Sequence, residues 1–518
     1  MANPSLQIGN SNWAIKEDNL LGYSTAGTRF VPQPITMTRA SAGTRVNSSG
    51  LVETVELLGS EEVVNGDFNN GTTDWTVTGS GTASIVDDAL NYSNTVNGSW
   101  FAQFISQAVS FVQNKIYKVT FKAKNISGSV NLRITHQSHI VFNNNLTSSF
   151  VDYTVYYTAQ ANNDSIRIFC NDAIGEFQID NVSVKESTKN NLARVDYDGT
   201  ASSLLVEPER TNLITYSNNF TDSSWLRVGS ITTTDNYTTS PSGQNNATRL
   251  QWTNATNYIY QSLPHFGSDF TLSIYLKSNT DVSQNVRLFM DNGAQGQDVV
   301  VTTQWQRFEL TNITTPTQSN RNAGLIKSGS QVGDLDISIW NAQFEEGSYP
   351  TSIIPTDGGT VTRVADQYSK TGISNLIGQT EGVIFLDFEI QTTNLDMVMM
   401  NIYNEATPSN CMYFYLNASN ILYAYCDNSG TQVAISDLVV LAQGRYKAAF
   451  SYKANDFKFY LNGDLMGVDI SGTVPTCSGF RLENYFASPI YQEKTQVNHA
   501  QLYKTTLTDS ELIALTTI

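Results

Sequence analysis

The stretch VNGDFNNGTTDWTVTGS, Val64–Ser80, returns in altered form later in the chain as YSNNFTDSSWLRVGS, Tyr216–Ser230. In both copies a phenylalanine precedes a tryptophan, and Trp225 follows Trp75 by 150 residues. A motif that returns at a fixed distance indicates that one structural unit occurs twice. We expect both tryptophans to lie in a core, because burial of a large aromatic ring strongly favours packing.

The rest of the repeat keeps the same order along the chain. The offset between the copies grows slowly, as insertions in surface loops would make it. The pairs that show this are Tyr117 with Phe270 at 153 residues, Phe150 with Trp305 at 155 and Asn181 with Asn341 at 160. We therefore predict two copies of one domain, at 59–188 and 212–347.

Alternation of apolar and polar residues dominates the sequence. It is clear in YKVTFKAKN, Tyr117–Asn125, and in FTLSIYLKSN, Phe270–Asn279, while FKFYLNGDLMG, Phe457–Gly467, reads as strand, Asn-Gly turn and strand. The best helical signal is LTDSELIALTTI, Leu507–Ile518, where Thr508 or Asp509 can cap. We predict an all-β protein of tandem jelly-roll-type β-sandwiches in series, with little helix.

Composition narrows the function classes. The formal net charge is −17, which argues against binding to nucleic-acid phosphates. Charged residues make up only 15%, so Asn, Ser, Thr, Gln and Gly must form most of the surface, as in extracellular or particle-borne β-proteins. No apolar run is long enough to span a membrane, and the four cysteines lack metal-site spacing, so we interpret them as buried thiols.

Extended segments that contain proline separate the expected domains. One is EEGSYPTSIIPTDGGTVTRVAD, Glu345–Asp366, and proline excludes a helix interior there. The apolar residues of these connectors predict that they pack against a surface: Leu204, Leu205, Val206, Ile353 and Ile354. The expected order is an N-terminal attachment segment 1–58, sandwich 59–188, connector 189–211, sandwich 212–347, connector 348–367 and a jelly roll 368–518.

Three resemblances follow from these residues. Both repeats resemble carbohydrate-binding modules of the galactose-binding-like kind, through NGDF…W, YKVTFKAK and QIDNVSVKE. Residues 368–518 resemble concanavalin-like, laminin-G-type domains, through YKAAFSYKANDFKFYLNGDLMG and QLYKTTLTDSELIAL. The phrases TMTRASAGTRVNSSGLVE, LLVEPERTNLITYSNNF and GSYPTSIIPTDGGTVTRVAD are similar to segments of tailed-bacteriophage virion proteins, particularly tail fibres.

The resemblance implies a bacteriophage virion structural protein of the tail-fibre or receptor-binding type. We expect it to bind glycans or the host surface without catalysis and to form a homo-oligomer attached to other virion proteins through its N-terminal segment. The start of the chain lacks the features of a signal peptide, so we expect synthesis in the host cytoplasm and localisation in the virion. The alternatives are a purely structural capsid or tail decoration protein and a polysaccharide depolymerase.

Glycan binding needs aromatic rings for stacking and polar groups for the hydroxyls. Four aromatic residues near predicted turns are candidates: Tyr92, Trp100, Trp252 and Tyr258. An equally good interpretation is that they anchor contacts between domains or subunits.

Catalytic and metal sites are weakly indicated. Asp387 and Glu389 share one face of the predicted strand FLDFEI, but a solvated strand face explains them better than a hydrolase site, so we expect no enzyme and no cofactor. Structural Ca²⁺ is common in the resembled folds, and the carboxylates that could bind it are Asp67, Asp180 and Glu186.

Overall fold

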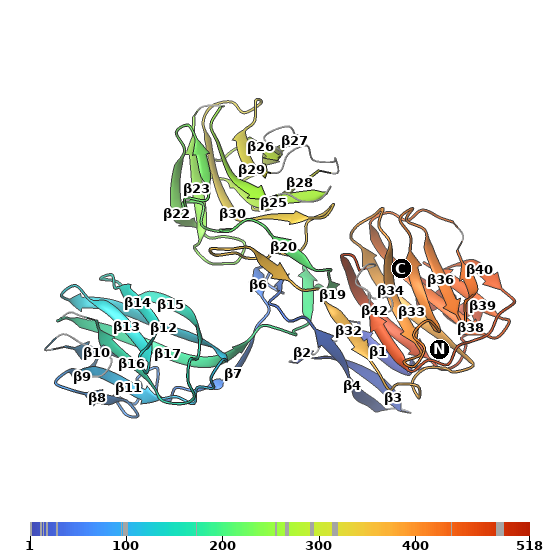
Figure 1. Cartoon of the computed structure of the whole chain (residues 1–518), viewed down its shortest axis with the longest axis horizontal. Coiled ribbons are helices and arrows are strands. Elements are labelled where there is room, and N and C mark those ends of the chain that lie inside the picture. The colour runs from blue at the N-terminus through green and yellow to red at the C-terminus, as the bar shows by residue number, and fades with distance from the viewer. Residues whose placement is uncertain are drawn as a thin grey trace. The chain divides into compact units, whose positions relative to one another are not determined.

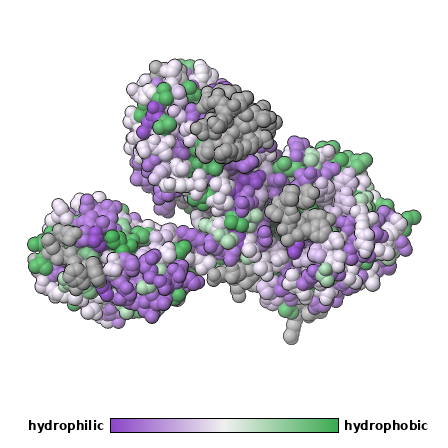
Figure 2. Space-filling model, viewed as in Figure 1, coloured by the Kyte–Doolittle hydropathy of each residue, from purple (hydrophilic) through white to green (hydrophobic). Residues whose placement is uncertain are grey.

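The computed structural model describes residues 3–10, 13, 15–16, 19–26, 29–94, 96, 102–171, 174–253, 256–264, 269–290, 295–312, 320–436, 438–482 and 492–518. Their regular secondary structure is almost entirely strand (Figure 1), which confirms the all-β prediction. On the face that Figure 2 shows, hydrophilic and neutral residues cover most of the surface and hydrophobic residues are scattered among them. None of the described helical residues forms a segment long and apolar enough to cross a membrane.

The chain divides into two compact units. One is Glu56–Thr188, and the other combines Met1–Val55 with Lys189–Ile518. We call Glu56–Thr188 the first sandwich and residues 212–347 of the larger unit the second sandwich. Each sandwich has its own apolar core.

The first sandwich consists of two antiparallel sheets. The order in one sheet is β15 (Val151–Thr158), β12 (Ile116–Ser127), β17 (Glu176–Thr188), β10 (Ala89–Ser93) and β9 (Thr82–Val86), and β7 (Leu57–Glu61) also pairs with β17. The order in the other is β14 (His139–Asn145), β13 (Asn131–His136), β16 (Ser165–Cys170), β11 (Phe104–Ala108) and β8 (Thr76–Thr78).

The second sandwich repeats this order strand for strand. One sheet runs β28 (Gln306–Asn312), β25 (Phe270–Ser278), β30 (Leu335–Glu346), β23 (Ala247–Trp252) and β22 (Thr232–Thr238). The other runs β27 (Gln295–Val301), β26 (Gln284–Met290), β29 (Asn320–Lys327), β24 (Tyr258–Pro264) and β21 (Leu226–Val228). The shared strand order is the structural counterpart of the sequence repeat.

The repeated motifs have the same role in both sandwiches. Trp75 and Trp225 are 6% and 2% exposed, so both are core residues as predicted. Each indole Nε1–H donates to a backbone carbonyl of its own opening motif, that of Asn65 at 3.1 Å and that of Tyr216 at 2.8 Å.

The closing strands also match. Asn181 and Asn341 interrupt β17 and β30 with positive φ angles of 54° and 50°, a conformation that asparagine tolerates better than most residues. The N–H of the following residue donates to a carbonyl of the opening motif at 2.9 Å, from Val182 to Gly66 and from Ala342 to Ser217. Opening and closing strands are thus joined in the same way twice.

The third domain is built around β33 (Glu381–Ile390), which pairs with β38 (Gly444–Lys453) and β42 (Thr495–Tyr503). The pairings of this domain form one closed network. Its other strands are β32 (Gln367–Lys370), β34 (Met397–Tyr403), β35 (Cys411–Leu416), β36 (Leu422–Asp427), β37 (Thr431–Ile435), β39 (Phe457–Leu461), β40 (Asp464–Asp469) and β41 (Gly479–Leu482). Thr508 and Glu511 form a capping box on the helix α1 (Asp509–Thr516).

Strands from the chain's beginning complete this domain. β1 (Leu6–Gly9) pairs with β42 and with β3 (Asn19–Ala26), and β4 (Arg29–Thr38) pairs with β3 and β32. β2 (Ile15–Lys16) pairs with β3. Strands of the predicted attachment segment 1–58 thus belong to the same domain as residues 368–518. The sequence pattern could not show this pairing, because it joins residues hundreds of positions apart.

The connectors also become strands. β18 (Arg194–Asp198) and β19 (Ala201–Val206) form a hairpin on β42, and β20 (Arg210–Asn212) pairs with β31 (Val361–Arg363). A short hairpin, β5 (Thr44–Val46) with β6 (Val52–Thr54), precedes them. The five apolar connector residues named above are at most 3% exposed, so the connectors do pack against the protein.

A cluster of five buried charges ties these segments together, and we call it the ion cluster. Arg39 contacts Asp366 at 2.6 Å, and Arg194 and Arg363 contact Glu207 at 2.7 and 2.8 Å. Arg194 also contacts Asp366. Burial alone would raise the pKa of Glu207, but the nearby Arg363 and Arg194 hold it well below its ordinary value. Buried ion pairs therefore hold together three segments that are far apart in sequence.

Candidate functional site

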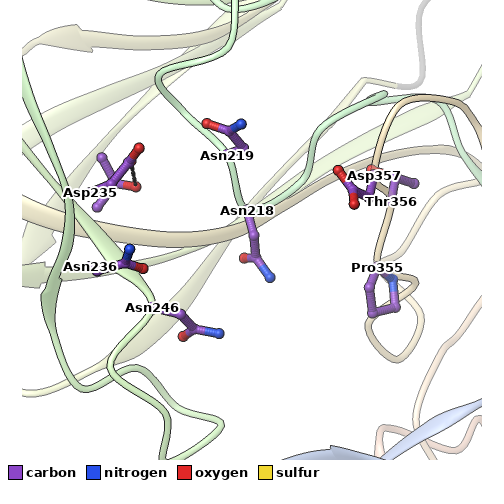
Figure 3. Close-up of a pocket in the computed structure, with 9 residues that line it drawn as sticks. Asn218, Asn219, Asp235, Asn236, Asn246, Pro355, Thr356 and Asp357 are labelled. Atoms are coloured by element: carbon purple, nitrogen blue, oxygen red, sulfur yellow. Dashed lines mark hydrogen bonds between the residues drawn. The ribbon is translucent and has the colours of Figure 1, made fainter. Parts of the chain in front are cut away.

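A polar pocket of about 500 Å³ opens in the second sandwich (Figure 3). Its lining residues come from the loop before β21, from β22 and β23, and from the second connector. They are Asn218, Asn219, Asp235, Asn236, Asn246, Thr248, Pro355, Thr356 and Asp357. Amides and carboxylates dominate this list, and these are the groups that bind sugar hydroxyls.

A bulge in β22 creates the pocket. Thr234 pairs with Arg249 and Thr238 with Ala247, so β22 has more residues in this interval than its partner strand. The surplus residues leave the ladder, as in a bulge that redirects side chains. Asn236, with φ of 51°, lies in this interval and lines the pocket.

Hydroxyl groups fix the Asp235 carboxylate. The Thr248 hydroxyl donates to Oδ1 at 2.9 Å and the Thr221 hydroxyl donates to Oδ2 at 2.6 Å. Thr248 is 1% exposed, so its hydrogen bond is made from inside the sandwich. The carboxylate is held in place without a cation and keeps acceptor capacity toward the pocket.

Two asparagine amides are available to a ligand. Asn218 accepts the Asn341 N–H through Oδ1 at 2.9 Å, which orients its amide. Asn246 Oδ1 is buried and has no hydrogen-bond partner, which is costly for a buried polar atom. In Figure 3 the side chains of Asn236 and Asn246 extend from one side of the pocket toward Asn218. The pocket therefore presents amide groups of Asn218, Asn236 and Asn246 to a ligand.

The predicted aromatic candidates do not meet at this pocket. Tyr92 is 0% and Trp252 2% exposed, so neither ring presents a face for stacking, and the prediction for these two is corrected. Tyr258 is half-buried and packs beside Tyr260 and Phe289 at 5.5 and 5.7 Å between ring centres. Trp100 lies outside the described residues.

The predicted Ca²⁺ ligands do not converge either. Asp180 forms an ion pair with Lys122 at 2.8 Å and Glu186 one with Lys115 at 2.8 Å. Asp67 accepts hydrogen bonds from Asn69. Within the described ranges, His, Cys, Asp and Glu form no group of three that could hold a metal ion. The prediction failed because each carboxylate has a partner on its own strand pair or turn.

The two carboxylates considered for catalysis are held by the fold. Arg445 binds Asp387 with both arms, Nε at 2.8 Å and Nη2 at 2.6 Å, and Asn498 adds a bond at 3.2 Å. Gln391 donates to Glu389 at 3.2 Å. A bidentate ion pair fixes the orientation of a carboxylate, so Asp387 has a structural role.

Sequence reasoning missed the pocket residues. The available signal was the polar stretch NYTTSPSGQNNATRL, Asn236–Leu250, whose length and Asn content differ from the matching stretch of the first copy. It carries no aromatic residue in its Ser240–Ala247 part, and the search for sugar sites looked for aromatic rings.

No protein-family model and no curated protein sequence matches the chain. Among solved structures it is similar to the CBM40 of the Ruminococcus gnavus IT-sialidase, with 14% identity, a TM-score of 0.25, and 28% of this chain and 91% of that chain covered. It is similar to the N-terminal CBM22-1–CBM22-2 tandem domain of Paenibacillus barcinonensis Xyn10C, with 11% identity, a TM-score of 0.22, and coverage of 57% and 98%.

A further similar structure is the Trypanosoma rangeli sialidase in complex with 2,3-difluorosialic acid, with 9% identity, a TM-score of 0.24, and coverage of 96% and 88%. These three similar structures are carbohydrate-binding modules and a sialidase. At these TM-scores the likeness carries no argument about function, so the proposal below rests on the chain's own residues.

Proposed function

We propose that the chain is a non-catalytic glycan-binding protein and that the pocket of the second sandwich is its binding site. The observation that carries this proposal is a pocket of about 500 Å³ whose lining gathers four asparagines and two aspartates. Sugar hydroxyls can bond the amide groups that face the pocket and the Asp235 carboxylate. Such a site binds weakly by itself, and several copies on one particle would give useful avidity.

Binding of the full chain to a glycan array tests the site. We expect signals that fall at least tenfold in Asn246→Ala and in Asn218→Ala. The melting temperature should change little in Asn246→Ala and should fall in Asn218→Ala, which leaves the Asn341 N–H without its acceptor. Asn144→Ala, at an exposed asparagine of the first sandwich, is the matched control and should bind as the unaltered chain does. Equal binding by all four proteins would reject the pocket as the site.

The biological setting that we propose is the bacteriophage particle, as a tail-fibre or receptor-binding protein in a homo-oligomer. The support is the resemblance of three phrases to virion proteins, and those phrases contain Arg39, Glu207, Arg363 and Asp366 of the ion cluster. Mass spectrometry of purified virions, followed by electron microscopy of labelled particles, tests this setting. Absence of the chain from virions would contradict it.

The same experiments separate the alternatives. A capsid or tail decoration protein would be found in virions but would give no specific signal on the array. A depolymerase would release reducing sugar from the host capsule, and Asp387→Asn would abolish that release. We expect no release, because Arg445 occupies both oxygens of Asp387.

A further inference from the structure

A second, smaller cavity lies inside the larger unit, beside the ion cluster. Its volume is about 160 Å³. Residues from the N-terminal hairpin, the second sandwich, both connectors and the third domain line it. Those that matter here are Asp196, Glu207, Arg307, Lys494 and Gln496. A cavity of this size has room for a small ion with a few waters, since one water takes about 30 Å³ in the liquid.

Two cations line this cavity without a carboxylate partner. The ion pairs of described residues around it join Arg45 to Glu53 and Glu207 to Arg194 and Arg363, and none of them includes Arg307 or Lys494. Lys494 Nζ has one long hydrogen bond, 3.4 Å, to the Pro350 carbonyl. Arg307 donates to the Thr351 carbonyl and the Ser273 hydroxyl at 2.7 Å each, and its Nε is buried without a partner.

The acids in the lining are already engaged. Glu207 accepts from the Ser352 N–H at 2.8 Å in addition to its two arginines. Asp196 accepts from the Val46 N–H at 2.6 Å and from Gln496 at 3.2 Å. Burial raises the pKa of Asp196, which weakens it further as a counter-charge. The cavity therefore has more positive than negative charge to satisfy, and unpaired buried charge is strongly unfavourable.

We propose that the cavity binds a small oxyanion of the phosphate or sulfate kind between Arg307 and Lys494. A guanidinium and an ammonium are the two groups that proteins use most for such oxyanions. The anion would accept from Lys494 and from the Arg307 guanidinium N–H groups that the bonds to Thr351 and Ser273 leave free. It would balance positive charge where the connectors meet. Its effect would be to stabilise the larger unit and leave the first sandwich unchanged.

Calorimetric titration of the full chain with inorganic phosphate, at constant ionic strength and pH 7, tests this site. We expect saturable binding at one site per chain, weakened at least tenfold in Arg307→Gln and in Lys494→Gln. Lys504→Gln removes the same charge at an exposed position and should bind normally. Absence of saturable binding, or equal binding in all variants, would overturn the proposal.

A measurement on the unaltered chain covers the case in which the variants fail to fold. A crystal grown or soaked in selenate should show an anomalous peak between the Arg307 guanidinium and the Lys494 amine. A cavity without anomalous density at selenate concentrations that saturate binding would overturn the proposal independently of any substitution. Sulfate also stabilises proteins by exclusion from their surface, but that effect does not saturate and would be the same in every variant.

Discussion

The first and second sandwiches share one strand order but differ at one connection. In the first, Asp87 and Asp88 join β9 to β10 with φ of 51° and 59°, as in the tight turn that two positive φ values produce. In the second, residues 239–246 separate β22 from β23, and the pairing shifts between Thr234 and Thr238. The bulge in β22 and the longer connection place Asn236 and Asn246 at the pocket, so the two sandwiches share a scaffold and differ at the proposed site.

The two sandwiches also differ at one matching core position. Thr248 pairs with Ile339 in the second sandwich as Leu90 pairs with Ile179 in the first. Leu90 belongs to the apolar core, whereas the Thr248 hydroxyl donates to Asp235 at 2.9 Å. At this matching position the first sandwich has an apolar contact, and the second has a hydrogen bond that holds a pocket residue.

The largest expected difference between the sandwiches concerns the ion cluster. Glu207→Gln leaves Arg363 buried without its carboxylate and leaves Arg194 with Asp366 alone. This loss should lower the free energy of unfolding of the larger unit by about 3–5 kcal/mol. Hydrogen exchange read by mass spectrometry should show faster exchange in 189–518 and unchanged exchange in 56–188. Glu186→Gln in the first sandwich, at a partly exposed pair with Lys115, is the control. Equal acceleration of hydrogen exchange in both units would contradict the expected difference between them.

The second-largest expected effect is a decrease in the unfolding free energy of the larger unit at acidic pH. Burial lowers the pKa of His499 to about 4. Between about pH 6.5 and pH 4 the imidazole is neutral in the folded protein and protonated in the unfolded chain. The unfolded state then binds more protons, so the unfolding free energy falls as pH decreases, by roughly 2–3 kcal/mol over this window.

Urea titrations at several pH values measure this dependence. His499→Gln should flatten it in the larger unit, and an unchanged slope would contradict the assignment. Burial also lowers the pKa of His136, so the first sandwich should lose stability with the same sign. Below about pH 4.5, protonation of Glu207 and Asp366 adds a further loss, because their pKa values are lowered in the folded state.

The opening motifs should behave alike in the two sandwiches. Trp75→Phe and Trp225→Phe each remove an indole donor and leave the Asn65 or Tyr216 carbonyl short of a partner. We expect a loss of about 1–2 kcal/mol in each case, confined to the sandwich that carries the substitution. Chemical unfolding followed by domain-resolved hydrogen exchange measures it. Losses that differ by more than twofold would show that the repeat is not equivalent at this position.

The smallest effect should come from placing an apolar residue at position 248, which matches Leu90 of the first sandwich. Thr248→Val removes one of the two hydroxyl groups that donate to the Asp235 carboxylate, and the hydroxyl of Thr221 remains. We expect a stability change of about 1 kcal/mol or less and a few-fold loss of glycan binding, measured on the same array. Leu90→Val is the matched change in the first sandwich and should leave binding as it was.

The sequence predicted local and repeated features well. The repeat, the core tryptophans, the Asn462–Gly463 turn with φ of 53° and 94°, and the Thr508 cap are all present. Each depends on residues close in sequence or on direct comparison of two copies. Such features can be predicted without a structure, because neighbouring residues determine local conformation and the pattern of burial.

The features that the sequence did not predict are non-local. Pairing of β1 with β42 joins the two ends of the chain, and the ion cluster gathers Arg39, Arg194 and Asp366. No periodicity identifies which distant strand or charge will be the partner. The site prediction failed for a related reason: Tyr92 and Trp252 lie on strands whose inward face is set by register, and one residue decides between core and surface.

A crystal structure of the full chain with the strongest glycan found on the array tests the central claim directly. The account predicts glycan density in the pocket of the second sandwich, within hydrogen-bond distance of the Asn218 amide and the Asp235 carboxylate. Density on the first sandwich, or on the third domain with this pocket empty, would contradict it.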